Sequence, residues 1–330
     1  MRHVDRRELD GGSVQLTGEK RIPPCREKQI PRFARDDRRF ARDDRGERVK
    51  QLLALAFIVA MVAGPAGFAS AQQLEEKSTD RKTFSGAHEL IIDNITGFIE
   101  VTAGSGNTVE VEIEKSLKAR SQDRMDLAKK EISLAVKQDG GLVQLMVDGP
   151  FRCHCADDST NFHGRALYDF TYNFKVRVPR DIYLELKTVN DSHVLVEGTS
   201  GDYKISNVNG GIEMREVEGS GSVHTVNGKV TVSFARNPKA ATSFKSVNGT
   251  LDITFRGGLN ADAKMKTMNG GLYTDFPVTA LPVASVQPER RDGGFVWKSN
   301  RMTGVRIGSG GPELSFETLN GNVLIKNREK

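Results

Sequence analysis

One short phrase recurs along the second half of the chain and limits how that half can fold. Each copy holds an Asn, nearly always followed by Gly, between two runs in which apolar and polar residues alternate. The asparagines stand at positions 190, 209, 227, 248, 269 and 320, so the steps are 19, 18, 21, 21 and 51 residues. A period near 20 residues with one insertion indicates a repeat architecture. The copies are LKTVNDSHVLV (186–196), ISNVNGGIEM (205–214), VHTVNGKVTV (223–232), FKSVNGTLDI (244–253), MKTMNGGLYT (265–274) and FETLNGNVLI (316–325), with IDNITGFIEV (92–101) as a degenerate copy.

Residues at fixed distances from each Asn form columns of like side chains. A large apolar residue stands four positions before the Asn, a small polar residue two before it, and another apolar residue directly before it. Alternation on both sides of a fixed turn predicts strand, turn, strand. We expect the column directly before Asn to face the core, so that Val226→Asp or Val247→Asp unfolds neighbouring units. In the order given, the columns are Leu186, Ile205, Val223, Phe244, Met265 and Phe316; Thr188, Asn207, Thr225, Ser246, Thr267 and Thr318; and Val189, Val208, Val226, Val247, Met268 and Leu319.

Two architectures compete for this repeat. Asn-Gly tolerates the positive φ of tight turns and is a strong hairpin signal, which predicts an antiparallel meander. A solenoid instead stacks each turn of about 20 residues on the last, so that like side chains line up at the strand spacing of about 4.8 Å. Identical columns favour the solenoid, with the small polar column forming a ladder of side-chain hydrogen bonds. The predicted turn residues are Asn190, Asn209, Gly210, Asn227, Gly228, Asn248, Gly249, Asn269, Gly270, Asn320 and Gly321.

The repeated VNG phrase, the later stretch IGSGGPELSFETLNGNVLI (307–325) and a preceding export signal resemble the bacterial putative-adhesin family of uncharacterised domains known as DUF4097. The resemblance covers about residues 87 to 327. It implies an all-β, parallel β-helix-like solenoid in an exported protein, and it carries over no catalytic residues. The chain lacks a C-terminal stretch long enough for the membrane barrel of an autotransporter.

The rest of the chain divides by composition. Residues 72–86 are expected to be a linker, 87–188 an irregular N-terminal β cap with a helix near 121–131, and 189–330 the solenoid, with a loop insertion at 277–308 that holds Trp297. The helix candidate has Ser121 as a possible N-cap and a short apolar face. We expect it to cover the open edge of the first repeats.

Residues 49–71 are typical of a signal peptide. A basic start leads into an apolar core from Leu52 to Val62, and Ala69 and Ala71 form an A-x-A cleavage pattern, with cleavage expected after Ala71. The alternative, a membrane anchor, needs about 20 apolar residues. Residues 1–48 are a charged extension, expected to be disordered, that repeats RFARDDR in tandem; translated upstream DNA and a basic interaction tail both fit it. The mature protein is therefore expected in the periplasm or outside the cell.

The excess positive charge does not indicate a nucleic-acid partner. Residues 1–50 hold 15 Lys and Arg against 10 Asp and Glu, which leaves 33 of each in the rest of the chain (48 − 15 and 43 − 10). The part expected to fold is therefore neutral. No nucleophile elbow, phosphate loop, HExxH or repeated CxxC motif is present in the sequence, which favours a protein that is not an enzyme and needs no cofactor.

Two candidate sites remain open at the level of sequence. Cys153 and Cys155 in RCHCADDSTNFHG (152–164) could form a strained disulfide, stay as thiols, or bind zinc with His154 and His163; no metal is the favoured prediction. A column three residues before each Asn, including Lys187, His224, Lys245 and Lys266, could form a basic stripe that meets acidic polysaccharide or phospholipid, or could be a solvated face.

Three functional hypotheses follow from this sequence. The first is an exported, non-enzymatic adhesin-like solenoid that presents a repetitive surface to an envelope protein or polysaccharide. The second is a periplasmic scaffold or accessory protein of envelope-stress signalling. The third, a carbohydrate-active enzyme on a β-helix, would need a cluster of catalytic carboxylates that the columns do not contain.

Overall fold

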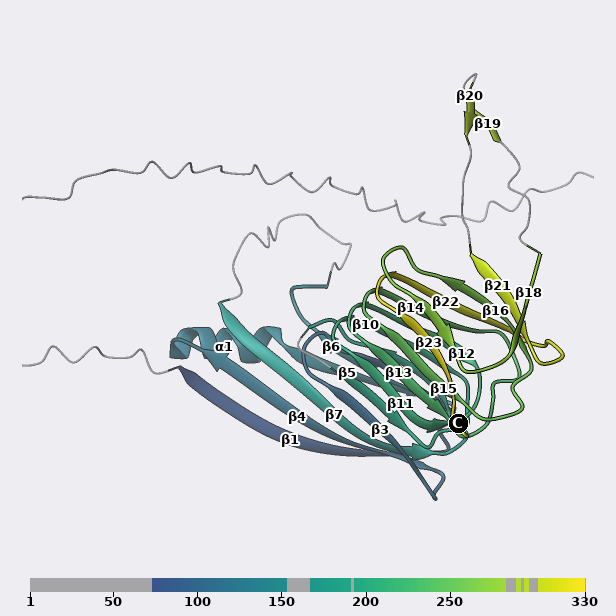
Figure 1. Cartoon of the computed structure of the whole chain (residues 1–330). Coiled ribbons are helices and arrows are strands. Elements are labelled where there is room, and N and C mark those ends of the chain that lie inside the picture. The colour runs from purple at the N-terminus through teal and green to yellow at the C-terminus, as the bar shows by residue number, and fades with distance from the viewer. Residues whose placement is uncertain are drawn as a thin grey trace, which may run out of the picture. The chain divides into compact units, whose positions relative to one another are not determined.

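The computed structural model describes residues 73–152, 167–190, 193–282, 289–291, 294–296 and 302–329. These residues belong to one compact unit, Gly67–Lys330. The unit is all-β with one short helix, and two long sheets face each other across the core (Figure 1). The predicted fold class, a repetitive all-β fold, is confirmed.

The first sheet has ten strands, and their spatial order departs from their order in the chain at both ends. The order is β1 (Leu74–Ser85), β4 (Thr108–Ala119), β7 (Tyr168–Pro179), β3 (Ile99–Gly104), β9 (Val194–Glu197), β11 (Ile212–Val217), β13 (Val230–Phe234), β15 (Leu251–Phe255), β23 (Val323–Asn327) and β17 (Leu272–Thr274).

The second sheet has eleven strands. The order is β18 (Val278–Ala280), β21 (Thr303–Ile307), β16 (Ala261–Lys266), β22 (Glu313–Asn320), β14 (Thr242–Asn248), β12 (Gly221–Asn227), β10 (Tyr203–Asn209), β8 (Tyr183–Lys187), β2 (Glu89–Asp93), β6 (Leu142–Asp148) and β5 (Ser133–Asp139). A separate antiparallel pair joins β19 (Glu289–Arg291) to β20 (Gly294–Val296).

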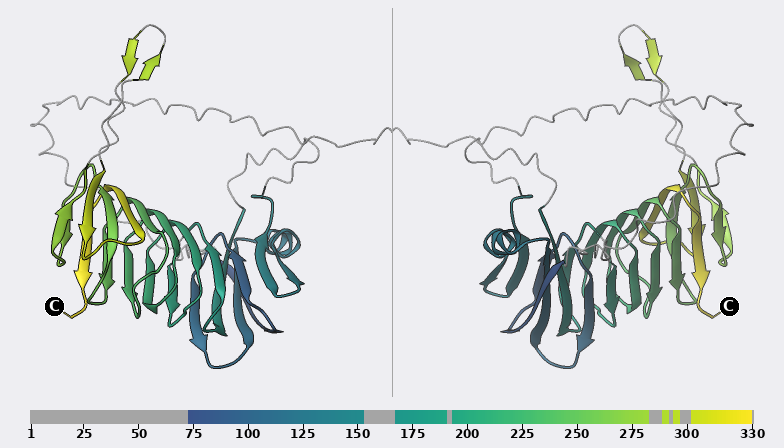
Figure 2. Two further views of the ribbon diagram at one scale, coloured as in Figure 1. Left: turned by 90° about the vertical axis from the view of Figure 1, so that its right-hand side faces the viewer. Right: turned by 90° about the vertical axis from the view of Figure 1, so that its left-hand side faces the viewer.

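The strands on either side of each Asn-Gly pair lie in different sheets, so the repeat is not a hairpin. β10 belongs to the second sheet and β11 to the first, and the same holds for β12 and β13 and for β14 and β15. Each strand pairs in parallel with its counterpart one repeat away, as β10 does with β12 and β11 with β13. One repeat is thus one coil of a solenoid, and Figure 2 shows the coils stacked along the molecule.

The register places like residues on like. Asn209 pairs with Asn227, and Asn227 with Asn248, so the columns read from the sequence are columns in space. The degenerate copy belongs to the stack, because β2 pairs in parallel with β8, β3 pairs with β9, and Thr96 bridges to Asn190. Parallel stacking therefore begins at residue 89, within the segment expected as the cap.

The last coil of the chain does not lie at the end of the stack. β22 pairs with β14 on one side and β16 on the other, and β23 lies between β15 and β17. The C-terminal coil is thus inserted between two coils that precede it in the sequence. In space the asparagines run 190, 209, 227, 248, 320 and 269.

Side chains on both surfaces of the sheet specify this order. Phe316 stacks on Phe244 with ring centroids 5.4 Å apart and meets Phe255 edge-on at 6.4 Å, in a fully buried aromatic cluster. Such pairs are stabilising beyond their buried area. On the outer face Glu317 lies between Lys245 and Lys266 and pairs with both. Stacking the coils in sequence order would instead place the two lysines side by side, which is destabilising.

The N-terminal end is built differently from the repeats. Residues 74–85, expected within the linker, form β1, which pairs antiparallel with β4 along twelve residues. The expectation of a linker was reasonable for such a polar segment, since most of β1 is exposed on both faces. Its charged side chains suit an edge strand, because they oppose pairing with another chain.

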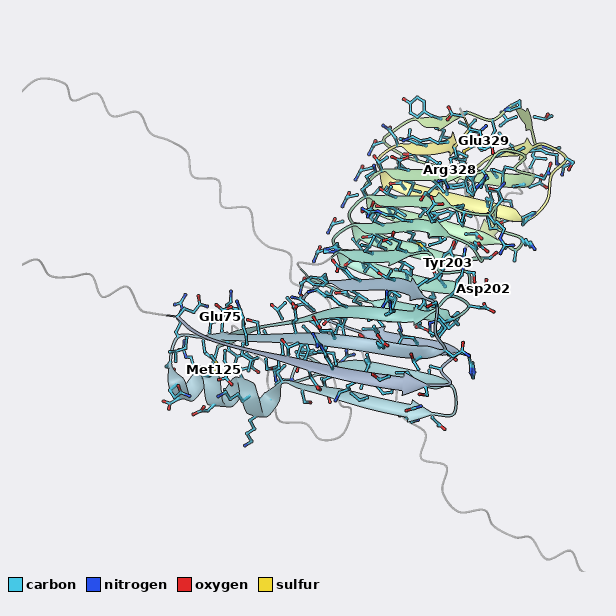
Figure 3. The ribbon with its side chains drawn as sticks, turned by 90° about the horizontal axis from the view of Figure 1, so that it is seen from below. Glu75, Met125, Asp202, Tyr203, Arg328 and Glu329 are labelled. Carbon is cyan, nitrogen blue, oxygen red and sulfur yellow. The ribbon has the colours of Figure 1, made fainter. Side chains whose placement is uncertain are left out.

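The helix α1 (Gln122–Glu131) packs on β4 and β7 through buried Met125 and Ala128 (Figure 3). Ser121 occupies the N-cap position but makes no side-chain capping bond. At the other end, the segment 277–308, expected as a loop insertion, contains β18, β19, β20 and β21, with β21 antiparallel to both β16 and β18. Trp297 lies outside the described residues.

Close stacking explains the glycines of the repeat better than turn geometry does. Gly210 and Gly321 have φ of 159° and 158°, which is extended backbone, and the glycines that follow Asn227, Asn248 and Asn269 do not have positive φ. A Cβ on Gly249 would instead clash with the carbonyl oxygen of Gly228 in the preceding coil, and Gly228, Gly270 and Gly321 are in the same situation. The expectation that positive φ requires these glycines was therefore wrong.

We predict that Gly249→Ala destabilises the protein by about 1–3 kcal/mol, because the methyl group must push two backbones apart. Gly106→Ala is the matched control, since a Cβ there meets only atoms at 3.7 Å or beyond. Urea unfolding of both variants measures the difference. Equal stability of the two variants would contradict the steric explanation.

Candidate functional site: the asparagine edge

At each corner of the solenoid, alternation separates the residues before Asn into buried and exposed columns. The large residue four positions before Asn is buried in every coil, as is the small polar residue two before it in all but Thr267. The polar side chains, which we call the inner polar column, line the core side of the corner. Its members are Asn94, Thr188, Asn207, Thr225, Ser246, Thr267 and Thr318.

The side chains of the inner polar column were expected to hydrogen-bond to one another. They hydrogen-bond instead to backbone carbonyls. Thr225 donates to the carbonyl of Gly210 at 2.9 Å, and Ser246 donates to the carbonyl of Gly228 at 3.1 Å. Thr188, Thr267 and Thr318 repeat the contact with Gly97, Gly321 and Gly249. Each hydroxyl thus satisfies the glycine carbonyl of the neighbouring coil, which a buried acceptor needs.

The side-chain ladder is formed by the asparagines themselves. All six are exposed, and in every one except Asn190 the amide nitrogen donates to the oxygen of the neighbouring asparagine in the stack. The distances from the donor Nδ2 to the acceptor Oδ1 are 3.0 Å from Asn209 to Asn190, 2.9 Å from Asn227 to Asn209, 2.8 Å from Asn248 to Asn227, 2.6 Å from Asn320 to Asn248 and 2.6 Å from Asn269 to Asn320. We call this row the asparagine ladder.

The ladder leaves hydrogen-bonding capacity unused. An amide has two N–H donors and an oxygen with two lone pairs. Asn209, Asn227, Asn248 and Asn320 each use one donor and one lone pair for the ladder, and no other contact of their amides is found among the described residues. Each therefore keeps one donor and one acceptor facing solvent.

The apolar residue directly before each Asn faces outward, so the predicted inward position was wrong. Val189, Val208, Val226 and Val247 are half-buried, and the side chains at the far end are open, with Leu319 39% and Met268 68% exposed. Side chains along a strand alternate between its two faces. Because the residue two positions before Asn points into the core, the residue directly before Asn must point outward. We call these six residues the outer apolar column. The argument that Val226→Asp or Val247→Asp buries a carboxylate no longer holds.

The predicted basic stripe, which we call the outer charged column, follows the same register on β8, β10, β12, β14, β22 and β16. Its lysines are paired. Lys187 lies 2.6 Å from Glu185, and Lys245 and Lys266 lie 3.4 and 3.6 Å from the Glu317 carboxylate between them. His224 is exposed. Inserting the C-terminal coil therefore places an acid in the middle of the row, and the lysines do not form an unbroken positive surface.

The opposite corner carries a different electrostatic feature. The carboxylate of Glu218, only 10% exposed, lies between Arg236 and Arg180, which come from coils on either side. The hydrogen bond from Arg236, helped by Arg180, holds the pKa of Glu218 below its usual value of 4.5. Glu218 and Arg236 line an open depression together with Asp181, Asp202 and Lys239. The Glu218 carboxylate is paired with both arginines, so we interpret the cluster as an ion-pair contact that holds neighbouring coils together.

Other predicted features fall outside this edge. Cys153, Cys155, His154 and His163 lie outside the described residues, as do the signal segment and residues 1–48. Within the described ranges, no three His, Cys, Asp or Glu side chains gather as a metal site. Over the same ranges no helix has the length and hydropathy to cross a bilayer.

Comparison with known proteins gives likeness of structure alone. No family model and no curated protein matches the chain, so the resemblance to DUF4097 stays a prediction. Among solved structures, a putative cell adhesion protein from Clostridium sporogenes is 11% identical, with 77% of this chain and 100% of that chain covered and a TM-score of 0.36. A putative adhesin from Bacteroides fragilis is 13% identical (76% and 97% covered, TM-score 0.27), and one from Parabacteroides distasonis is 12% identical (76% and 97%, TM-score 0.23).

We predict that Thr225→Val destabilises the protein by about 1–3 kcal/mol, because the partly buried carbonyl of Gly210 loses the hydroxyl of a fully buried side chain. Thr225→Ser keeps the hydroxyl and should lose less. Thermal unfolding of the two variants compares them. A serine variant as unstable as the valine variant would show that the methyl group, not the hydrogen bond, matters.

The tie at Glu218 predicts a dependence on pH. Because the folded pKa lies below the unfolded one, the ionised carboxylate stabilises the fold at neutral pH, and this stabilisation disappears as pH falls through the folded pKa. Glu218→Gln should therefore melt a few degrees lower at pH 7, with the difference shrinking below about pH 4.5. A constant difference between pH 7 and pH 3 would contradict this account.

Proposed function

We propose that this chain is an exported, non-enzymatic, adhesin-like solenoid that binds an envelope or extracellular component through the asparagine edge. The observation that carries the proposal is the repetition of one exposed amide, beside one outward-facing apolar side chain, on six stacked coils. A row of identical groups at strand spacing suits a ligand that repeats. Binding along a row sums many weak contacts into a useful affinity.

Export is the second part of the proposal. It is supported by the apolar run at 52–62 and the A-x-A pattern that ends at Ala71. The outer charged column, with Lys187, His224, Lys245 and Lys266, lies on the other side of the outer apolar column from the asparagine ladder and contributes the polar border of the same surface. The ligand itself is an envelope protein or polysaccharide.

The test follows the full-length chain in a bacterial host. We expect the protein outside the cytoplasm, with Gln72 at its N-terminus by sequencing, and retained on washed cell-envelope material in a pull-down. Leu55→Arg is the matched control, because it interrupts the apolar core of the signal and leaves residues 73–330 unchanged. An intact N-terminus in the cytoplasm would refute export, and no retention on envelope material would refute the binding role.

A further inference from the structure

The asparagine edge is chemically suited to one kind of ligand. The backbone groups at this corner bond from coil to coil, as Gly210 N does to Asn227 O at 2.9 Å and Gly228 N to Asn248 O at 3.0 Å. An extended peptide therefore cannot add here as it does at a sheet edge. The groups on offer are the unused donor and acceptor of each ladder amide, which together match a hydroxyl group, since a hydroxyl both donates and accepts.

The outer apolar column supplies a second kind of contact. It runs directly beside the asparagine ladder at the ends of the same strands, where four half-buried valines continue into the more exposed Leu319 and Met268. A ligand that fits both rows has hydroxyl groups along one border and C–H groups on its face. Sugar rings combine these two features, because their ring faces carry C–H groups and their rims carry hydroxyls.

Charge argues for a neutral ligand. The ladder has no charge, and Lys187, Lys245 and Lys266 in the neighbouring column are each paired with a carboxylate within 3.6 Å. Glu185 and Glu317 offset two of these three positive charges, which weakens the field that an acidic polymer would need for steering and affinity. The ligand inferred for the asparagine edge therefore differs from the acidic polysaccharide that the lysines alone suggested.

Spacing sets the form of the ligand. Successive amides follow the strand spacing of about 4.8 Å, so the six-membered ladder is about 24 Å long. An extended polysaccharide advances by a similar length for each ring. Successive rings can therefore meet successive coils, which a single compact sugar cannot do.

We propose that the asparagine ladder and the outer apolar column together bind an extended, uncharged polysaccharide, with ring hydroxyls on the amides and ring faces on the apolar side chains. This rests on the proposed function and names its ligand class.

Affinity electrophoresis of the purified, processed protein in gels containing hydroxyethyl cellulose, with polygalacturonate gels in parallel, tests the proposal. The decisive variant is the triple change Asn209→Thr, Asn227→Thr and Asn248→Thr. Threonine fits this corner, because Thr96 occupies the position on the first coil. We expect retardation of the native protein in the neutral gel, unchanged by salt, and affinity at least about tenfold lower in the variant from the loss of three amide contacts.

A control variant and a second test variant separate binding from folding. Glu213→Ala, Thr231→Ala and Thr254→Ala remove three outward side chains from the same coils on the first sheet and should leave retardation unchanged. Val226→Ser with Val247→Ser changes only the outer apolar column and should also weaken binding. Each variant is first shown to melt cooperatively, and Asn→Ser at the three ladder positions replaces the threonine variant if that one fails to fold.

The outcomes that overturn the proposal are specific. Equal retardation of the native protein and the ladder variant would overturn it, and so would no retardation in the neutral gel. Salt-sensitive retardation by polygalacturonate alone would point instead to the outer charged column. A dimer in sedimentation that the ladder variant abolishes would make the edge a self-association surface and also overturn it. In each of these cases the protein can still be retained on envelope material, which leaves the proposed function intact. Loss of that retention would instead refute the proposed function.

Discussion

The architecture depends on how closely neighbouring coils approach at the asparagine corner. Gly228, Gly249, Gly270 and Gly321 each lie against the glycine carbonyl of the neighbouring coil, where a Cβ has no room, and that carbonyl accepts a hydrogen bond from a Thr or Ser hydroxyl. Steric contact fixes the distance and the hydrogen bond fixes the register. A slip of one residue would turn the polar column outward and bury the lysines, so the two constraints support each other.

Those constraints allow any coil to stack on any other, because every copy carries the same phrase. The order of the last three coils must therefore come from residues that differ among copies. Phe316 fits the aromatic cluster with Phe244 and Phe255 better than the thioether of Met265 would, and Glu317 separates two lysines. Lys326 adds a third tie, since it reaches Asp252 on the neighbouring coil at 2.7 Å. The inserted C-terminal coil is thereby held on both sides by the coils it joins.

The columns, their stacking and the strand on each side of Asn could be predicted, since they follow from period and alternation alone. The insertion of the last coil could not, because identical phrases give no preference until Phe316 and Glu317 are placed beside their neighbours. The glycines of the Asn-Gly pairs were expected to serve a positive φ, but they are needed because a Cβ has no room. Both requirements select Gly, so the sequence could not distinguish them. The valines before Asn were placed inward because apolar residues flank the turn, although the alternation that begins at Leu186 or Phe244 already puts Thr188 and Ser246 inside.

Packing requires some columns of the edge and leaves others free. Packing requires the glycines and the inner polar column, because the corner has no room for a Cβ and the glycine carbonyls need a donor. The asparagine ladder adds hydrogen bonds between coils, but Thr96 at the same position of the first coil shows that the corner forms without an amide. The outer apolar column has no such requirement. Val suits a strand by its β-propensity, but Met268 and Leu319 lack a β-branch and are 68% and 39% exposed. A continuous apolar row beside unused amide groups is more than folding needs, and contiguous exposed apolar surface on a folded protein marks a place where something binds.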